Sequence, residues 1–289
     1  GGGITHLRNL LKYSDPGKYS VTQVSVWACA NTLSHLEDRP WLTKRTAWAL
    51  EKGAATRLLW SLQHQQRALR EAGVDIVFAP GANYFGRFPS VSMSQNLLPF
   101  DTREMGRFAY GKEYWRYLLL RHMQGYSFRR AAGVVFLSHT AKRVVSSHVD
   151  LRHARTAMIP HGISRRFMKA RERGYSIAGT VRILYVSIIN FYKHQKNLVQ
   201  AVGCLKRAGV DVELTLVGPA YGPALVELEK VIGEMDPEAT FIRYFGAVSH
   251  EELPGLYERA DIFAFPSTCE NMPNVLLEAM ACGLPVIST

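Results

Sequence analysis

The stretch Ile262 to Gly283, IFAFPSTCENMPNVLLEAMACG, holds the signal that decides the fold. Its first four residues are apolar and predict a buried strand, and the more polar residues that follow predict a loop. Pro273 suits the first turn of a helix, and Gly283 suits the position just after a helix ends. The stretch therefore predicts a strand, a loop and a helix in succession.

The same alternation surrounds this stretch throughout the second half of the chain. We expect strands over 181–186, 212–217, 240–245, 262–265 and 285–289. We expect helices around 197–208, 224–235, 251–260 and 274–282. Strands that alternate with helices in this way predict an α/β fold, with a parallel sheet covered on both faces.

The first half of the chain gives a mixed pattern. We expect a long helix from Trp41 to Glu71, ended by Gly73, and a second helix over 113–124. Strands are predicted over 75–80, 90–93 and 133–138, the last followed by a helix that Ser138 or Thr140 caps. Glycine, proline and arginine gather between residues 158 and 179, which predicts a connection between two domains, 1–160 and 161–289.

The composition is that of a globular protein with one basic half. Of 289 residues, 47% are hydrophobic and 20% charged, which excludes a disordered, collagen-like or disulfide-scaffold protein. Residues 1–163 hold 22 Lys/Arg against 10 Asp/Glu, a net charge of +12, whereas residues 164–289 have a net charge of −1. This predicts an anionic partner for the first domain. No nucleic-acid-binding module is visible, so we expect no nucleic acid.

Four cysteines, at positions 29, 204, 269 and 282, have neither CxxC spacing nor histidines clustered around them. They predict buried free thiols in a reducing compartment and no metal site. No apolar run approaches the roughly 18 residues of a membrane span.

The helix predicted from Asn274 is suited to binding an anion. Ligands of parallel sheets bind beyond the carboxyl ends of the strands, where the first N–H groups of the next helix have no partner in the helix. Glu278 stands among apolar residues of this helix. Either it is buried and needs a partner such as the ribose of a ligand, or it lies on a narrow exposed stripe.

Two other segments suit a phosphorylated ligand. Lys193 and Lys196 follow the strand predicted over 181–186, where lysines neutralise phosphate, although a solvated loop is the alternative. Gly1, Gly2 and Gly3 form a glycine-rich start that lets a ligand approach the backbone, or else a remnant of cloning.

At these residues the sequence resembles glycosyltransferase family 4. Glu270 and Glu278 match the E-x7-E motif of that family. The segments 266–267, 273–281, 283, 285–286, 217–218, 245–246, 256–257 and 260–261 also match, and Ile159-Pro160-His161-Gly162 resembles the hinge motif I-P-N-G. The resemblance is specific over residues 159–289.

The resemblance implies GT-B architecture, that is, two Rossmann-like domains whose parallel sheets face each other across a cleft. It implies a retaining, metal-independent hexosyltransferase without a cofactor, whose donor is a UDP-, GDP- or ADP-linked sugar. The first domain would bind a glycan or lipid-linked hydroxyl acceptor, in the synthesis of cell-surface polysaccharide or glycolipid.

The resemblance also implies roles for individual residues. Glu270 would contact the donor sugar, Lys193 the phosphate and Glu278 the ribose. Gly2 and Gly3 would approach the diphosphate, and backbone N–H groups around Asn271, Met272, Pro273, Asn274 and Val275 would hold sugar and phosphate. His139 and His161 are candidates for proton transfer. Asn96, His139 and Arg143 are candidates on the acceptor side.

The sequence departs from the family in two respects. Ser187-Ile188 stands where the family has Gly-Arg, so phosphate binding would depend on Lys193, with Lys196 or a base of the first domain as substitutes. We also expect a fragment that lacks the first strand and the C-terminal end. A degenerate GT-B domain that binds glycan or protein, a nucleotide-sugar epimerase and a phosphorylase are the alternatives.

Aromatic and basic residues alternate along the first domain. They occur within the helix predicted over 41–71 and again at Trp115, Arg116, Tyr117, Arg121 and His122. A basic amphipathic helix lies on anionic lipid, or is a packed helix with a solvated basic face. We therefore expect a cytoplasmic protein, which is peripheral on the inner face of the cytoplasmic membrane if this helix lies on anionic lipid.

Overall fold

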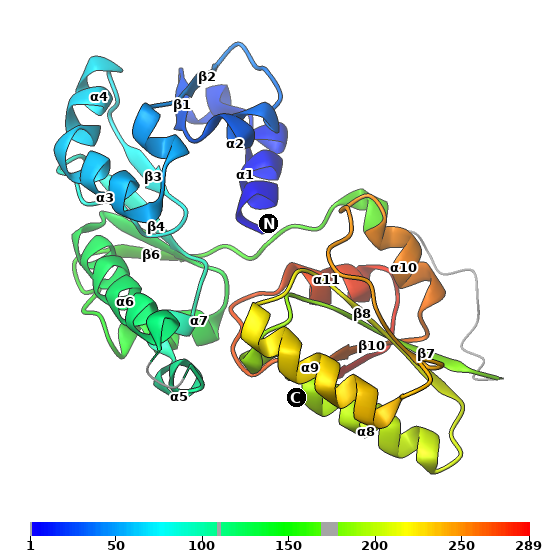
Figure 1. Ribbon diagram of the computed structural model, residues 1–289. Coiled ribbons are helices and arrows are strands. Elements are labelled where there is room, and N and C mark those ends of the chain that lie inside the picture. The colour runs from blue at the N-terminus through cyan, green and yellow to red at the C-terminus, as the bar shows by residue number, and fades with distance from the viewer. Residues whose placement is uncertain (1, 109–110, 169–178) are drawn as a thin grey trace. The chain divides into compact units, whose positions relative to one another are not determined.

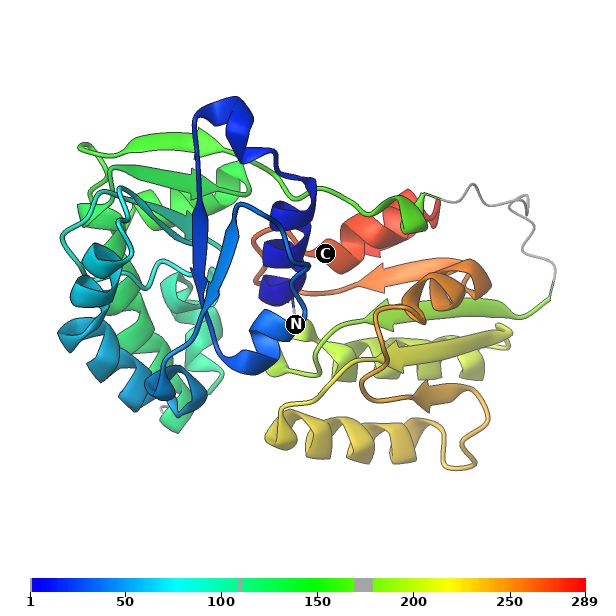
Figure 2. The ribbon, with the colours of Figure 1, turned by 90° about the horizontal axis from the view of Figure 1, so that it is seen from above.

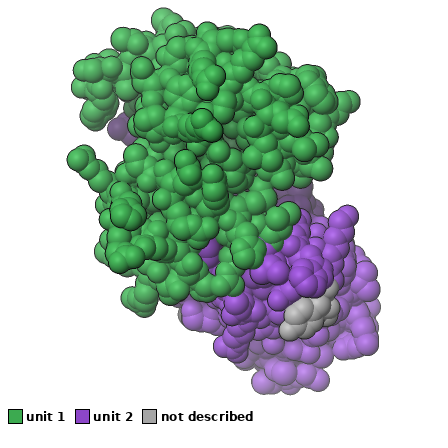
Figure 3. Space-filling view, turned by 90° about the vertical axis from the view of Figure 1, so that its left-hand side faces the viewer, with its two compact units in different colours: residues 1–95, 119–160 green, residues 96–118, 161–289 purple. Residues whose placement is uncertain are grey.

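The computed structural model describes residues 2–108, 111–168 and 179–289. Its Cα positions group into two compact units, coloured separately in Figure 3. Unit 1 comprises residues 1–95 and 119–160, and unit 2 comprises residues 96–118 and 161–289. Both units are built on parallel strands.

Unit 2 contains a five-stranded parallel sheet in the order β11-β10-β7-β8-β9, which Figure 2 shows from above. Its strands are β7 (Val181–Val186), β8 (Val212–Val217), β9 (Ile242–Tyr244), β10 (Ile262–Phe265) and β11 (Val286–Ser288). Its α-helices after residue 160 are α8 (Gln195–Arg207), α9 (Gly222–Met235), α10 (Leu253–Arg259) and α11 (Asn274–Ala281), and its 3-10 turns there are η4 (Arg165–Phe167) and η5 (Phe191–Lys193). Every strand and helix predicted here is present.

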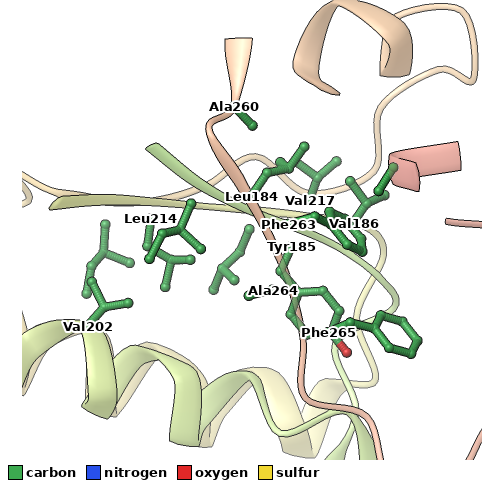
Figure 4. Close-up of a cluster of buried hydrophobic side chains, with 14 of the residues drawn as sticks. Leu184, Tyr185, Val186, Val202, Leu214, Val217, Ala260, Phe263, Ala264 and Phe265 are labelled. Carbon is green, nitrogen blue, oxygen red and sulfur yellow. The ribbon is translucent and has the colours of Figure 1, made fainter. Parts of the chain in front are cut away.

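Helices cover both faces of this sheet. Figure 1 shows α8 and α9 on one face and α10 and α11 on the other. Figure 4 shows the core between them, where Leu214 of β8 and Phe263 of β10 are completely buried. A leucine buried in this way stabilises the fold by about 1.5–3 kcal/mol.

Two glycines shape turns of unit 2, one after β8 and one after α11. Gly218 follows β8 with φ +142°, and a Cβ atom there would lie 2.1 Å from the Ser187 carbonyl oxygen. Gly283 follows α11 with φ +72°. Its N–H donates to the Met280 carbonyl while the Leu284 N–H donates to that of Ala279, so the helix ends in a Schellman motif.

Unit 1 contains a four-stranded parallel sheet in the order β3-β4-β5-β6 and a parallel pair, β1-β2. The strands are β1 (Val24–Trp27), β2 (Leu42–Arg45), β3 (Val77–Ala79), β4 (Ser90–Ser94), β5 (Gly133–Phe136) and β6 (Arg155–Met158). The helices of residues 2–160 are α1 (Gly2–Tyr13), α2 (Ala30–Ser34), α3 (Ala54–Gln63), α4 (Gln65–Glu71), α5 (Thr102–Gly106), α6 (Lys112–Arg130) and α7 (His139–Ser146), with 3-10 turns η1 (Pro16–Tyr19), η2 (Trp48–Glu51) and η3 (Leu98–Phe100). α5 and the first residues of α6 belong to unit 2. Ser138 caps α7 by accepting from the Ala141 N–H at 3.1 Å, as predicted.

The predicted long helix from Trp41 to Glu71 is wrong. This segment contains β2, η2, α3 and α4, because Leu42 to Arg45 pair with β1 and Gly53 separates η2 from α3. The aromatic and basic residues of 41–71 therefore do not lie along one helix, and Trp60 is buried.

The four cysteines are free, but not all are buried as predicted. Cys269 and Cys282 are buried, Cys29 is half-buried and Cys204 is exposed on α8. Within the described residues, no helix is long and apolar enough to cross a membrane. The same residues contain no cluster of three or more His, Cys, Asp or Glu side chains placed to hold a metal ion.

Candidate functional site

The candidate site lies at the carboxyl edge of the sheet in unit 2. β7 and β10 are parallel neighbours that pair Ile183 with Ile262. Because the two strands run in the same direction, the loops that follow them leave the sheet at the same edge. The loop after β7 leads into η5, and the loop after β10, residues 266–273, leads into α11.

Lys193 at the end of η5 forms an ion pair with Glu270 in the loop before α11. The Lys193 side chain is 9% exposed and that of Glu270 is 22% exposed. Ser267 Oγ donates to the same carboxylate oxygen, Glu270 Oε1, at 2.6 Å. A buried ammonium group needs an anionic partner, which Glu270 supplies. Lys193 is therefore not part of a solvated loop.

Further hydrogen bonds join the two loops. The Tyr192 carbonyl accepts from the Thr268 N–H at 3.1 Å, and His194 Nε2 lies 3.0 Å from Thr268 Oγ1. The buried Tyr185 hydroxyl donates to the Lys193 carbonyl at 3.0 Å. Lys193 and Glu270 are thus held by backbone contacts as well as by their own pairing.

Glu278 of α11 is buried, which excludes the narrow exposed stripe. Its Oε2 accepts from the Tyr257 hydroxyl at 3.2 Å, and its Oε1 lies 3.2 Å from His250 Nε2. Burial raises the pKa of Glu278, while the hydrogen bond from Tyr257 and the charge of Arg166 act in the opposite direction. The carboxylate therefore has two protein partners in this structure.

The amino end of α11 borders the same loop. Pro273 is its N-cap residue, so Asn274 and Val275 supply the first N–H groups of the helix. Met272 Sδ accepts from the His161 N–H at 3.1 Å, and Asn271 precedes it in the loop. The first N–H groups of this helix, beside the Lys193–Glu270 pair, suit a phosphate.

Lys196 is not brought together with Lys193 and Glu270. It lies in the first turn of α8 and pairs with Glu227 of α9 at 3.1 Å. Both residues line a separate pocket of about 330 Å³, together with Arg107, Phe191 and His194. Its proposed role as a second phosphate-binding lysine gains no support from this placement.

The remaining predicted residues occupy varied positions. Gly2 and Gly3 form the start of α1, whereas Gly1 lies outside the described residues. His139 is the first residue of α7 and is exposed, as is Arg143 one turn later. Asn96 Oδ1 accepts from the Leu98 N–H at 3.1 Å, so this side chain caps a local turn.

Sequence reasoning missed four side chains that contact the predicted glutamates directly or through a neighbour: Ser267, Tyr257, His250 and Arg166. Ser267 and Tyr257 stand within segments that match the family, but a match of residue type does not show which oxygen a hydroxyl reaches. His250 and Arg166 stand in polar segments that carry no signal of their own.

The chain is similar in sequence to known glycosyltransferases. Residues 170–289 match the family model of the glycosyl transferases group 1. The α-D-kanosaminyltransferase of Streptomyces kanamyceticus is 26% identical over 265 residues, which cover 84% of this chain and 64% of that protein. The chain spans less than two thirds of the length of the curated relatives it matches.

Solved structures agree on the fold. Sucrose-phosphate synthase of Thermosynechococcus elongatus superposes with a TM-score of 0.69 at 18% identity, covering 88% of this chain and 67% of that one. Anabaena HepE in complex with UDP and glucose superposes with a TM-score of 0.67 at 18% identity, covering 100% and 77%. The predicted GT-B fold is confirmed. The family resemblance is confirmed over residues 170–289 at the level of group 1 glycosyltransferases.

Proposed function

We propose that the chain is part of a retaining, metal-independent glycosyltransferase of family 4 that moves a hexose from a nucleotide-sugar to a hydroxyl acceptor. The observation that carries the proposal is the pairing of Lys193 with Glu270 beside the amino end of α11. Cationic and polar groups of this kind are those that a departing diphosphate and its sugar require.

In this proposal each group of the site acts on one part of the donor. Lys193 and the first N–H groups of α11 neutralise the charge that develops on the diphosphate as the bond between C1 of the sugar and the phosphate oxygen breaks. Glu270 contacts the sugar hydroxyls, and Glu278 contacts the ribose. The acceptor oxygen bonds to C1 on the face that the diphosphate leaves, and His139 is the candidate for accepting its proton.

We take UDP as the first nucleotide to test, because the HepE structure contains UDP and glucose. GDP and ADP are the alternatives. The acceptor is a glycan or lipid-linked hydroxyl compound, bound by the basic unit 1 in a cytoplasmic protein that contacts anionic membrane peripherally. Similarity to the O-antigen chain mannosyltransferase B of Escherichia coli supports a glycan acceptor.

Binding of nucleoside diphosphates tests the proposal. Calorimetry should show that the chain binds one of UDP, GDP and ADP, and that Lys193→Met weakens this binding by about tenfold or more. Glu270→Gln should lower the rate of donor hydrolysis or transfer by about a hundredfold with a smaller effect on nucleotide affinity. Lys230→Met and Glu234→Gln, exposed on α9, are the matched controls.

One observation favours a second candidate, a degenerate GT-B domain without activity. Ile188, which stands in place of the arginine of the family, is 40% exposed at the phosphate-binding edge. If the wild-type chain binds none of the three nucleotides while a glycan or protein ligand binds, this second candidate replaces the first.

A further inference from the structure

A chain of contacts links Glu278 to the segment that joins the two units. His250, in the loop before α10, places Nε2 3.2 Å from Glu278 Oε1. Arg166 of η4 places Nη2 3.4 Å from the same His250 nitrogen. Phe167 packs edge-on against the rings of both His250 and Tyr257, with centroids 5.5 and 5.9 Å apart.

The geometry decides how His250 is protonated. A single ring nitrogen cannot donate to a carboxylate and accept from a guanidinium at the same time. His250 Nδ1 is buried, and no hydrogen-bond partner reaches it from the residues that the structure describes. A proton on Nδ1 would leave a buried N–H group without a hydrogen-bond partner. Protonation of both ring nitrogens would also place a second positive charge beside Arg166. The proton on His250 Nε2 is therefore donated to Glu278 Oε1.

Arg166 consequently acts on Glu278 by charge rather than through a hydrogen bond to His250. Its Nε atom is buried and has no hydrogen-bond partner among the described residues. The positive charge lies close enough to oppose the effect of burial on the Glu278 carboxyl group. An ionised carboxylate can accept hydrogen bonds from two ribose hydroxyls, whereas a protonated one loses part of its acceptor capacity to the proton.

Building on the proposed function, we propose that Arg166 and His250 are positioning residues that keep Glu278 ionised and oriented to receive a ribose. His250 aims Oε1, Tyr257 aims Oε2, and Arg166 supplies the charge. Nucleotide affinity is then sensitive to residues that need not touch the nucleotide.

The ionisation of Glu278 should depend on every titratable group that faces it. These groups are Arg166 on η4, His250 before α10, Tyr257 on α10 and Cys282 after α11. Burial raises the pKa of Tyr257 and that of Cys282, the latter to about 11, so both are neutral near pH 7. Arg166 is therefore the cation in this group that opposes the rise in the pKa of Glu278 caused by burial.

The test measures the titration of Glu278 directly. Carboxyl 13C resonances of glutamate should show the Glu278 signal, assigned by its loss in Glu278→Gln, titrating at higher pH in Arg166→Met than in the wild-type chain. Arg243→Met, an exposed arginine of β9, is the matched control and should leave the titration unchanged. An unchanged titration in folded Arg166→Met overturns the proposal.

Affinity for UDP, with GDP and ADP in parallel, is the second readout. His250→Leu should weaken nucleotide binding by about tenfold, the effect of one hydrogen bond to a charged group, while His250→Gln should restore it because the amide also donates. Equal affinity of His250→Leu and the wild type overturns the proposed role of His250. A wild-type chain that binds no nucleotide, yet shows the shifted titration, contradicts the proposed function and leaves the ionisation by Arg166 supported.

Discussion

Lys193 and Glu270, 77 residues apart in the sequence, pair at the carboxyl edge of one sheet. Their strands β7 and β10 are neighbours in that sheet, so the fold itself brings the two loops together. The Ser267 hydroxyl donates to the same oxygen of Glu270, at 2.6 Å. The pair thus serves the stability of the loops as well as the proposed chemistry.

Removing the two partners should have unequal effects on stability. Glu270→Gln leaves a nearly buried ammonium group without an anion, and breaking a buried pair from one side costs about 3–5 kcal/mol. Lys193→Met keeps the apolar stem and leaves Glu270 more exposed and bonded to Ser267, so it should cost about 1–2 kcal/mol. Urea unfolding measures both variants, with Lys230→Met as the control. A larger loss for Lys193→Met than for Glu270→Gln would contradict the burial argument.

Gly218→Ala should be strongly destabilising, because φ is +142° there and the added methyl group would meet the Ser187 carbonyl at the end of β7. We expect a loss of about 3 kcal/mol or more, together with a distorted candidate site. Gly209→Ala is the matched control, since its φ is also positive, at +85°, but a Cβ atom would enter open space. It should cost only about 1 kcal/mol. Equal losses in urea unfolding would show that backbone conformation alone, and not the close approach, determines the effect.

Much of unit 2 could be predicted from the sequence because each strand is an apolar run bounded by turn residues. Val181 to Val186 and Ile262 to Phe265 are examples. The loop with Glu270 and the helix with Glu278 were also predictable, since Pro273 and Gly283 mark the ends of α11. The contact between Glu270 and Lys193 depends on the order of the strands in the sheet. A family resemblance implies that order, whereas the residues of a single strand do not reveal it.

Unit 1 was harder to predict because its second strand carries little apolar signal. Leu42-Thr43-Lys44-Arg45 is a strand only through its pairing with β1, and its four side chains are all half-buried. The direction in which a side chain points could not be predicted from the sequence either. Lys196 is three residues from Lys193, yet it points to Glu227 of α9 because the start of α8 turns the chain between them.

Alkylation should distinguish the four cysteines. Burial raises the pKa of Cys269 to about 12, helped by the charges of Asp101, Glu270 and Glu104, so its thiol is neutral and shielded at pH 8. Hydrogen bonds to Thr32 lower the pKa of the half-buried Cys29. Iodoacetamide at pH 8 should therefore label Cys204 and Cys29 well before Cys269 and Cys282, as peptide mass spectrometry would show. Rapid labelling of Cys269 in the folded chain would contradict its burial.

Asp236 should make the stability of unit 2 sensitive to acid. Burial alone would raise the pKa of this carboxyl group, but the N–H groups of Thr240, Phe241 and Ile242 donate to it and lower the pKa below its usual value. A lowered pKa adds stability above the unfolded value of about 3.9, and this stability is lost as the pH falls through the folded value.

Asp236→Asn should therefore be destabilised at pH 7 by about 1–3 kcal/mol, and its difference from the wild type should shrink below about pH 4. Glu238→Gln, an exposed neighbour, is the control and should show no such convergence. Urea unfolding between pH 7 and pH 3 measures the difference. A gap that stays constant over this range would exclude Asp236 as the source.

The exposed face of α6 should bind anionic vesicles. Trp115, Leu119 and Tyr126 are 60%, 56% and 39% exposed, and their spacing places them on one face of the helix. Arg129 and Arg130 continue this face, and the Arg130 guanidinium lies 5.6 Å from the centre of the Tyr126 ring. Aromatic side chains beside arginines suit the boundary between lipid headgroups and acyl chains.

Sedimentation with phosphatidylglycerol vesicles should therefore carry the chain down, while neutral phosphatidylcholine vesicles should not. The double substitution Arg129→Gln and Arg130→Gln should weaken the free energy of vesicle binding by about 2 kcal/mol, which is a roughly thirtyfold loss of affinity. Each arginine near an anionic membrane surface contributes about 1 kcal/mol to this binding. Val226→Ser, a 68% exposed residue of α9, is the control for loss of a single apolar side chain elsewhere. Equal binding to both kinds of vesicle, or to neither, would leave α6 an ordinary packed helix with a solvated basic face.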